Sequence, residues 1–270
     1  MNKTLNNLLL AILFTMVSTT QVFAKEKSLS FAFFPYVNPS KILQHNKGLK
    51  HFLTKELKHP VSLITAKNSL DYFKKVKKSS YDIIFSAPHI GRYAELYAGY
   101  KRVAVTTNRI QGLYIVRESS KISQLSDLKN KTIAMASSVT ILHQIALDDL
   151  KHQNLTPGKD ITVKETKNHL NAIFALIKGK ADVALTGVLL WKKLPKKYKS
   201  QLRLLDNSTK ICGFTVMAHK NLKPELLEKA KKSLLHFHES KEGTKYLFKG
   251  FRTLSDKDMK QLDPYIDIFK

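Results

Sequence analysis

Tyr81-Asp82-Ile83-Ile84-Phe85-Ser86-Ala87-Pro88-His89 is the stretch of sequence that decides the fold class. Residues 81–85 form an almost continuous apolar run, which is typical of a strand in a parallel sheet that helices cover on both faces. Residues 86–89 follow and begin a helix that extends to about Tyr97. Around this unit, other β-rich runs alternate with amphipathic stretches: strands are expected at 29–34, 61–65 and 101–106, and helices from Ser40 to Leu57 and from Ser69. The alternation predicts an α/β fold with a largely parallel sheet.

The pattern then restarts, so the chain holds two similar α/β blocks, residues 25–115 and 118–208. A strand at 212–218 and a mostly helical tail from Pro224 are expected to return to the first block. We therefore expect two Rossmann-like lobes joined by a hinge of two chain crossings, near Arg117 and near 207–211. Lobe 1 would comprise residues 25–116 with 209–270, and lobe 2 residues 117–208. Ligands of open α/β sheets bind beyond the carboxyl ends of the strands, which places a binding site between the lobes.

Residues 1–24 have the pattern of a cleavable signal peptide. Lys3 supplies a positive start, and Leu8–Val17 is an apolar run too short to cross a membrane comfortably. Val22 and Ala24 provide small residues for cleavage. No Cys follows that would carry a lipid anchor, and no later stretch is apolar for about 18 residues. A protein exported to the periplasm and free of membrane spans after cleavage is expected.

The formal net charge of +25, of which the leader contributes only Lys3, favours anionic partners. The lysines are nevertheless spread over predicted helix faces, as at 74–78 and 192–197, without a recognisable nucleic-acid motif. We interpret them as a solvated surface that draws anions toward a cleft, and we expect no nucleic-acid partner. The single cysteine, Cys212, lies in an apolar run and is interpreted as a small core residue.

Four segments of the mature chain together resemble the phosphonate/phosphate-type (PhnD-like) solute-binding proteins of ABC transporters. The resemblance implies the type II periplasmic-binding-protein fold, a substrate-binding role and no enzymatic activity. The segments are Phe34-Pro35-Tyr36 with Asn38-Pro39, residues 81–88, Ser126-Asp127-Leu128-Lys129-Asn130-Lys131-Thr132-Ile133-Ala134, and Asn168-His169 with Ile177-Lys178-Gly179-Lys180-Ala181-Asp182-Val183-Ala184.

Two departures from the family pattern bear on the ligand. The family's Ser-Ser-Thr-Ser-Gly loop is reduced here to Ser137-Ser138-Val139-Thr140. Where phosphonate binders tend to carry an acid after the Ala-Asp-Val-Ala strand, this chain has Thr186-Gly187. An acid there would pair with a ligand amino group, so its absence disfavours aminophosphonates and leaves a simpler oxyanion or another ligand.

The candidate ligand contacts in lobe 2 are Ser137, Ser138, Thr140 and His169. The first three lie where a strand passes into a helix, and the free amides and dipole of a helix start favour phosphate-like anions. We expect Ser137 or Ser138 to cap this helix, and the alternative is that one serine serves only as the cap. The resemblance implies that His169, at the start of the next helix, also contacts the anion; the alternative is a solvent-facing side chain.

The candidate contacts in lobe 1 are Tyr36, Ser86 and His89. Tyr36 follows the first strand and would close on the ligand from the opposite lobe. Ser86 and His89 flank Pro88 at the end of a core strand. For each of them, ordinary packing is the alternative.

The sequence contains no motif for catalysis, nucleotide binding or metal binding. The sequence lacks Gly-x-Ser-x-Gly, His-Glu-x-x-His and a phosphate-cradling Walker loop. His236 and His238 stand two apart on a predicted helix and face different sides, so no metal site is expected, and no cofactor is. We predict a monomer that binds a small anion and delivers it to an ABC permease. Alternatives are a ligand-binding input for a membrane sensor, a basic polyanion-binding protein, or an enzyme on the same clamshell.

Overall fold

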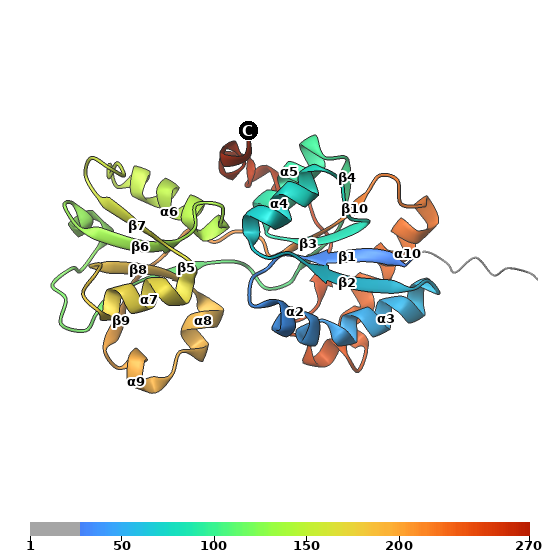
Figure 1. The fold of residues 1–270 in the computed structure, drawn as a ribbon, viewed down its shortest axis with the longest axis horizontal. Coiled ribbons are helices and arrows are strands. Elements are labelled where there is room, and N and C mark those ends of the chain that lie inside the picture. The colour runs from blue at the N-terminus through green and yellow to red at the C-terminus, as the bar shows by residue number, and fades with distance from the viewer. Residues whose placement is uncertain (1–27) are drawn as a thin grey trace, which may run out of the picture.

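The computed structural model describes residues 28–270, so the predicted leader lies outside the described residues. The chain forms two lobes, each built on a mixed sheet with helices on both faces (Figure 1). The two-lobed architecture is the type II periplasmic-binding-protein fold that the family resemblance implies. No helix between residues 28 and 270 combines the length and the apolar character that crossing a bilayer requires.

The first sheet has the strand order β11-β4-β10-β3-β1-β2. Strands β1, β2 and β3 are parallel, whereas β10 runs antiparallel to β3 and β4, and β11 runs antiparallel to β4. The predicted return of a late strand to the first block is therefore confirmed. The strands are β1 (Leu29–Phe33), β2 (Val61–Thr65), β3 (Ile83–Ser86), β4 (Tyr100–Thr106), β10 (Thr215–His219) and β11 (Phe251–Arg252).

The second sheet has the order β7-β6-β8-β5-β9. Strand β6 is parallel to β7 and β8, and β5 is antiparallel to β8 and β9. Each lobe thus has three parallel strands extended by antiparallel ones, a more mixed arrangement than expected. The strands are β5 (Gly112–Arg117), β6 (Thr132–Ala136), β7 (Thr162–Thr166), β8 (Val183–Gly187) and β9 (Leu202–Asn207).

Helices cover both faces of each sheet. In lobe 1, α4 and α5 lie on one face and α2, α3 and α10 on the other; in lobe 2, α6 and α7 lie on opposite faces (Figure 1). The helices are α2 (Pro39–His45), α3 (Lys47–Leu57), α4 (Ser69–Lys77), α5 (Pro88–Tyr97), α6 (Ile141–His152), α7 (His169–Ile177), α8 (Val188–Lys193), α9 (Lys196–Lys199), α10 (Pro224–His236) and α11 (Asp256–Lys260). Short 3₁₀ turns are η1 (Leu125–Leu128), η2 (Phe237–Glu239), η3 (Gly243–Lys245), η4 (Asp263–Tyr265) and η5 (Asp267–Phe269).

The helix predicted from Ser40 to Leu57 is two helices, because Asn46 interrupts it. Asn46 is fully buried, and its side-chain amide donates to the Ile42 carbonyl at 2.8 Å. Its side-chain oxygen accepts from the Tyr246 hydroxyl at 2.9 Å. Because the Asn46 side chain hydrogen-bonds both to the preceding helix and to a distant residue, the chain breaks between the two helices here. The spacing of apolar residues gives no sign of this break.

Two adjacent crossings connect the lobes. Ile110 and Ile211 form an antiparallel bridge in which each amide donates to the other's carbonyl. Strand β5 belongs to the second sheet, so the first crossing precedes Gly112 and does not lie near Arg117 as expected. The sequence of β5 reads as one more apolar strand, and nothing in it indicates which sheet it joins.

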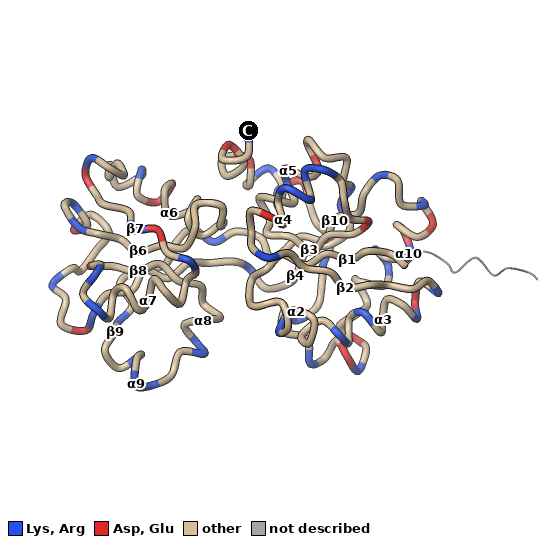
Figure 2. The backbone as a smooth tube through the Cα atoms, viewed as in Figure 1, with Lys and Arg blue, Asp and Glu red and all other residues tan. Residues whose placement is uncertain are grey.

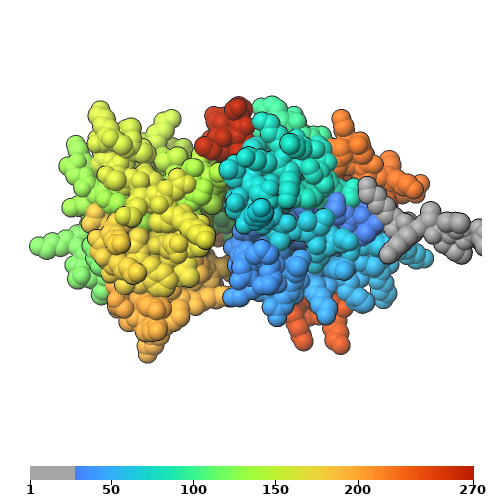
Figure 3. Space-filling model, in the orientation of Figure 1, coloured from blue at the N-terminus to red at the C-terminus, as the bar shows by residue number. Residues whose placement is uncertain are grey.

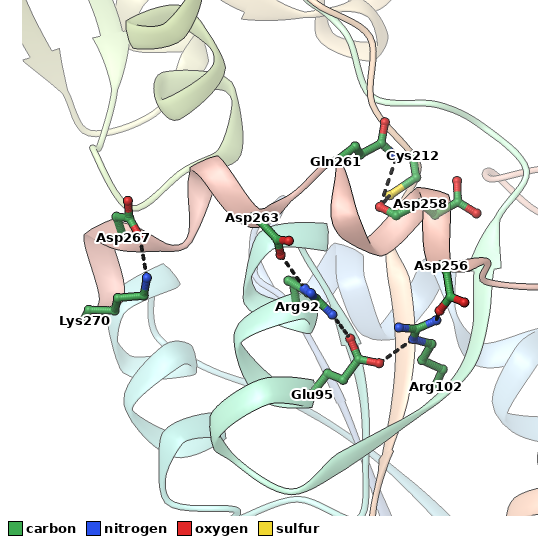
Figure 4. Close-up of polar contacts among 10 residues, drawn as sticks. All are labelled: Arg92, Glu95, Arg102, Cys212, Asp256, Asp258, Gln261, Asp263, Asp267 and Lys270. Atoms are coloured by element: carbon green, nitrogen blue, oxygen red, sulfur yellow. Dashed lines mark hydrogen bonds and ion pairs between the residues drawn. The ribbon is translucent and has the colours of Figure 1, made fainter.

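The C-terminal segment, residues 254–270, lies between the lobes and contacts both α5 and α6 (Figure 1). Ion pairs hold it to lobe 1: Arg92 pairs with Asp263 at 2.6 Å, and Arg102 pairs with Asp256 (Figure 4). Toward lobe 2, the Tyr265 hydroxyl lies 3.5 Å from a carboxylate oxygen of Asp148. The tail therefore braces the junction of the two lobes.

Candidate ligand site between the lobes

The loop between β6 and α6 carries unused amides next to its contact with lobe 1. Thr140 is the N-cap residue of α6, but its hydroxyl donates to the Ser137 carbonyl at 2.8 Å and does not cap the helix. The expectation that Ser137 or Ser138 caps α6 is therefore wrong. Among residues 28–270, the amides of Val139, Ile141 and Leu142 have no hydrogen-bond acceptor. They lie at the positive end of the helix dipole, where an anion is stabilised.

One amide of this loop is already occupied by a carboxylate. The backbone N–H of Ser138 donates to Oε1 of Glu165 at 2.8 Å, and the Ser138 carbonyl accepts from the Gln144 side chain at 2.7 Å. The hydroxyls of Ser137 and Ser138 make no hydrogen bond with the described residues. The loop thus keeps two hydroxyl donors available, with a negative charge at its edge.

His169 and Thr186 both lie on the side of the second sheet that α7 covers. His169 is the first residue of α7, which Asn168 caps through a hydrogen bond from the Asn171 amide at 2.9 Å. Burial lowers the pKa of His169 to about 4, and the Leu185 carbonyl partly opposes the shift. Thr186 is the residue next to Leu185 and lies on the face of β8 that α7 covers. Nδ1 of His169 and Oγ1 of Thr186 are both buried without a hydrogen-bond partner between residues 28 and 270.

His89 makes the closest polar contact across the lobes. It lies in the first turn of α5, which Gly91 allows to approach β10 so closely that a Cβ there would lie 2.0 Å from Oγ1 of Thr215. The ring is fully buried, and its Nε2 atom lies 3.1 Å from the carbonyl oxygen of Val139 in lobe 2. Burial lowers the pKa of His89 to about 4, so the ring is neutral near pH 7. Because Nε2–H donates to a carbonyl, Nδ1 carries the lone pair and is a hydrogen-bond acceptor.

Ser86 ends β3 three residues before His89. Its side chain is fully buried, and Oγ has no well-formed hydrogen bond among the described residues. It lies close enough to the Tyr72 hydroxyl to oppose part of the pKa rise that burial causes there. The Ser86 carbonyl accepts weakly from the Thr215 hydroxyl at 3.5 Å, which fixes the strand end but leaves the side chain unused.

Tyr36 has partners within lobe 1. Its ring packs against Phe85, Phe214 and Phe248, and its hydroxyl accepts from the Asn46 side chain at 3.3 Å. Burial raises the pKa of this hydroxyl. Contact between Tyr36 and a ligand stays a prediction.

Four buried polar atoms thus lack partners at the facing ends of the two sheets. Ser86 Oγ and His89 Nδ1 come from lobe 1, and His169 Nδ1 and Thr186 Oγ1 from lobe 2. Leaving such an atom unpaired costs about 1–3 kcal/mol. A polar ligand held between the lobes would satisfy them, and none of the four groups carries a charge near pH 7. In the described part of the chain, no three His, Cys, Asp or Glu side chains gather as a metal site would require.

The family model for "ABC transporter, phosphonate, periplasmic substrate-binding protein" matches residues 31–259. The chain belongs to this family. Its members are transport proteins of the periplasm, so a small ligand and a permease are the partners that membership implies.

Several solved structures share the fold at low sequence identity. XAC2383 from Xanthomonas citri, bound to chloride ion, is 15% identical with a TM-score of 0.78, covering 89% of this chain and 98% of that one. PhnD1 from Prochlorococcus marinus in complex with methylphosphonate is 17% identical with a TM-score of 0.75, covering 88% and 97%. A binding protein component of an ABC phosphonate transporter from Pseudomonas aeruginosa is 16% identical with a TM-score of 0.75, covering 88% and 86%.

Six of the predicted contact residues, all except Tyr36, border this junction. Thr186 also borders it and was not predicted. In the sequence, Thr186 stands out only because it occupies a position where phosphonate binders tend to carry an acid. The signal available was its position: it is the last polar residue of a buried strand whose carboxyl end faces the hinge.

Proposed function

We propose that this protein captures a small phosphorus oxyanion, of the phosphonate or phosphate type, between its lobes and delivers it to an ABC permease. Membership of the phosphonate family supports the transport role. We further propose that residues 1–24 direct export and are removed, and that the protein acts as a monomer.

The observation that carries the proposal is the set of four buried, unpartnered polar atoms contributed equally by the two lobes. Binding proteins of this architecture work by hinge closure around a ligand. A ligand that pairs with groups on both sides stabilises the closed form, because opening would again leave those groups without partners.

The chemistry of His89 favours phosphorus oxyanions over sulfate. Its Nε2–H is engaged by Val139, so its Nδ1 atom accepts a hydrogen bond and does not donate one. Phosphate-type groups have a second pKa near 6, so a monoanion that carries a P–OH donor is still populated at neutral pH and can be bound selectively, whereas sulfate has no such form. Ser86 and Thr186 supply hydroxyl donors to the remaining oxygens. The neutral donors suit reversible capture, because each hydrogen bond from such a donor to the charged ligand contributes about 1.5–3 kcal/mol.

A ligand without an ammonium group fits the residues at the end of β8. Thr186 is followed by Gly187, and a side chain at that position would meet only the Leu142 methyl, at 3.6 Å. Neither residue supplies a carboxylate to pair with an amino group. Methylphosphonate, phosphite and phosphate are therefore proposed in preference to 2-aminoethylphosphonate.

A thermal-shift series with residues 25–270 tests the proposal. Phosphate, phosphite, methylphosphonate, 2-aminoethylphosphonate, sulfate and taurine are compared at one moderate salt concentration. A ligand at about 100 times its dissociation constant stabilises the folded state by about 2.7 kcal/mol. We expect a higher melting temperature with at least one phosphorus oxyanion and no change with sulfate. Absence of a shift with every phosphorus compound, or an equal shift with sulfate, would contradict the proposal.

A further inference from the structure

Helices α8 and α9 form a basic projection on lobe 2, residues 188–200. It carries five lysines within eight residues, and the chain has no acid between Asp182 and Asp206. Figure 1 shows the projection extending beyond the second sheet, and Figure 2 shows its lysines clustered there. The lysines are Lys192, Lys193, Lys196, Lys197 and Lys199.

The lysines of the basic projection have no carboxylate partners among residues 28–270. Elsewhere on the surface lysines do pair with acids: Lys75 lies 3.1 Å from Asp71, and Lys231 lies 4.0 Å from Glu228. The positive charge of the projection is therefore uncompensated locally, unlike that of other lysine-rich helices.

Aromatic and aliphatic side chains lie among these lysines. Nζ of Lys199 stands 4.9 Å from the centre of the Trp191 ring, and Nζ of Lys197 stands 5.0 Å from that of Tyr198. Leu189 is 39% exposed on the first turn of α8. Trp191 and Tyr198 each have one side against the core of lobe 2 and are partly exposed on the other.

The basic projection lies at the edge of the interlobe junction. Helix α8 begins directly after β8, which carries Thr186. Burial lowers the pKa of His45 in α2, and the charges of Lys193 and Lys41 lower it further. Because Lys193 acts on His45, the end of α8 lies near α2 of the opposite lobe. Figure 3 shows a notch between the lobes at this lower margin.

We propose that the basic projection binds the surface of a bilayer containing anionic phospholipids. Its lysines would contact the phosphate headgroups, and Leu189 and Trp191 would enter the interfacial layer. Lysines that flank a tryptophan and an exposed aliphatic side chain are the combination that favours a lipid interface. A purely electrostatic partner, such as an acidic protein surface, would need no exposed leucine. Each lysine at such a surface strengthens binding by about fivefold, and salt weakens the attraction.

Membrane binding here would set the orientation of the molecule. Because the basic projection adjoins the notch, the opening between the lobes would face the bilayer in which a permease lies. This consequence rests on the proposed function, whereas lipid binding itself does not.

Trp191 makes the test specific, because it is the only tryptophan in the chain. Residues 25–270 are titrated with vesicles of phosphatidylethanolamine and phosphatidylglycerol, some with brominated acyl chains that quench tryptophan. We expect quenching of Trp191 fluorescence that high salt reverses and that phosphatidylcholine vesicles do not produce. No quenching by the anionic vesicles would overturn the proposal and would leave an acidic protein as the partner to seek.

A pair of matched variants separates this site from general attraction to the basic surface. Lys192→Glu with Lys193→Glu removes the same charge as Lys231→Glu with Lys232→Glu on α10. We expect the first pair to weaken vesicle binding at least tenfold more than the second, with melting temperatures retained in both. Equal loss in the two would overturn the proposal. Oxyanion binding measured on the same samples tests the transport function separately.

Discussion

His89 and Val139 join the two lobes through a hydrogen bond, with the Nε2 atom of His89 3.1 Å from the Val139 carbonyl oxygen. The Phe269 ring lies beside the imidazole, with ring centres 5.1 Å apart. Val139 belongs to the loop that offers free amides at the start of α6. One histidine therefore contacts the loop of the opposite lobe through Nε2 and keeps Nδ1 for a further partner.

The buried histidines make stability depend on pH. Burial lowers the pKa values of His89 and His169 to about 4, below their ordinary value of about 6.5. Between these values the unfolded chain binds protons that the folded chain does not, so stability is complete above about pH 6.5 and declines as pH falls toward 4. Between pH 7.5 and pH 5 we expect His89→Gln to remove on the order of 2 kcal/mol of this decline. Calorimetry from pH 7.5 to 5 measures it, and an unchanged slope in the variant would contradict a neutral, buried His89.

Glu165 places a negative charge at the anion-binding loop. Its carboxylate accepts from the Ser138 amide at 2.8 Å. We expect Glu165→Gln to tighten methylphosphonate binding by about two- to fivefold at low ionic strength, because a repulsive charge at the edge of the site is removed. Titration calorimetry measures the change, with Glu118→Gln, on the loop after β5, as the control. Weaker binding in the Glu165 variant would show that this carboxylate mainly orders the loop.

Phe269 anchors the C-terminal segment. It is 6% exposed, and its ring centre lies 4.1 Å from that of Phe73. Phe269→Ala should lower the free energy of unfolding by about 3–5 kcal/mol. Ile268→Ala is the matched control, since Ile268 is 47% exposed and should cost no more than about 0.5 kcal/mol. Denaturant melts of the two variants measure the difference. Equal stability would contradict the role of the tail as a brace between the lobes.

Local patterns predicted the elements well where burial alone decides. Strand β2 has the bounds expected for residues 61–65, and α5 begins within the expected stretch, residues 86–89. Features that depend on distant partners were missed. Asn46 splits a helix because Tyr246, two hundred residues later, donates to it. Strand β11 pairs Phe251 with Thr106 within a tail predicted to be mostly helical.

The candidate site was predictable only where local patterns locate its residues. Ser86, His89 and His169 lie at strand ends or helix starts, positions that the strand–helix alternation locates. The expected helix cap at Ser137 or Ser138 failed because Thr140 turns its hydroxyl back to the Ser137 carbonyl. The interlobe contact of His89 with Val139 joins residues fifty apart on different lobes, and no local pattern encodes it.

The most direct test of the account is titration calorimetry of methylphosphonate with three forms of residues 25–270: wild type, Thr186→Val and Thr65→Val. The Thr186 hydroxyl is buried without a partner, whereas that of Thr65 donates to the Phe33 carbonyl at 2.9 Å. A hydrogen bond to a charged ligand contributes about 1.5–3 kcal/mol, so we predict one ligand per chain and an affinity at least about tenfold lower in Thr186→Val. The unliganded Thr186 variant should be no less stable than the wild type, and Thr65→Val should keep full affinity. Wild-type affinity in the Thr186 variant would contradict an oxyanion site between the lobes.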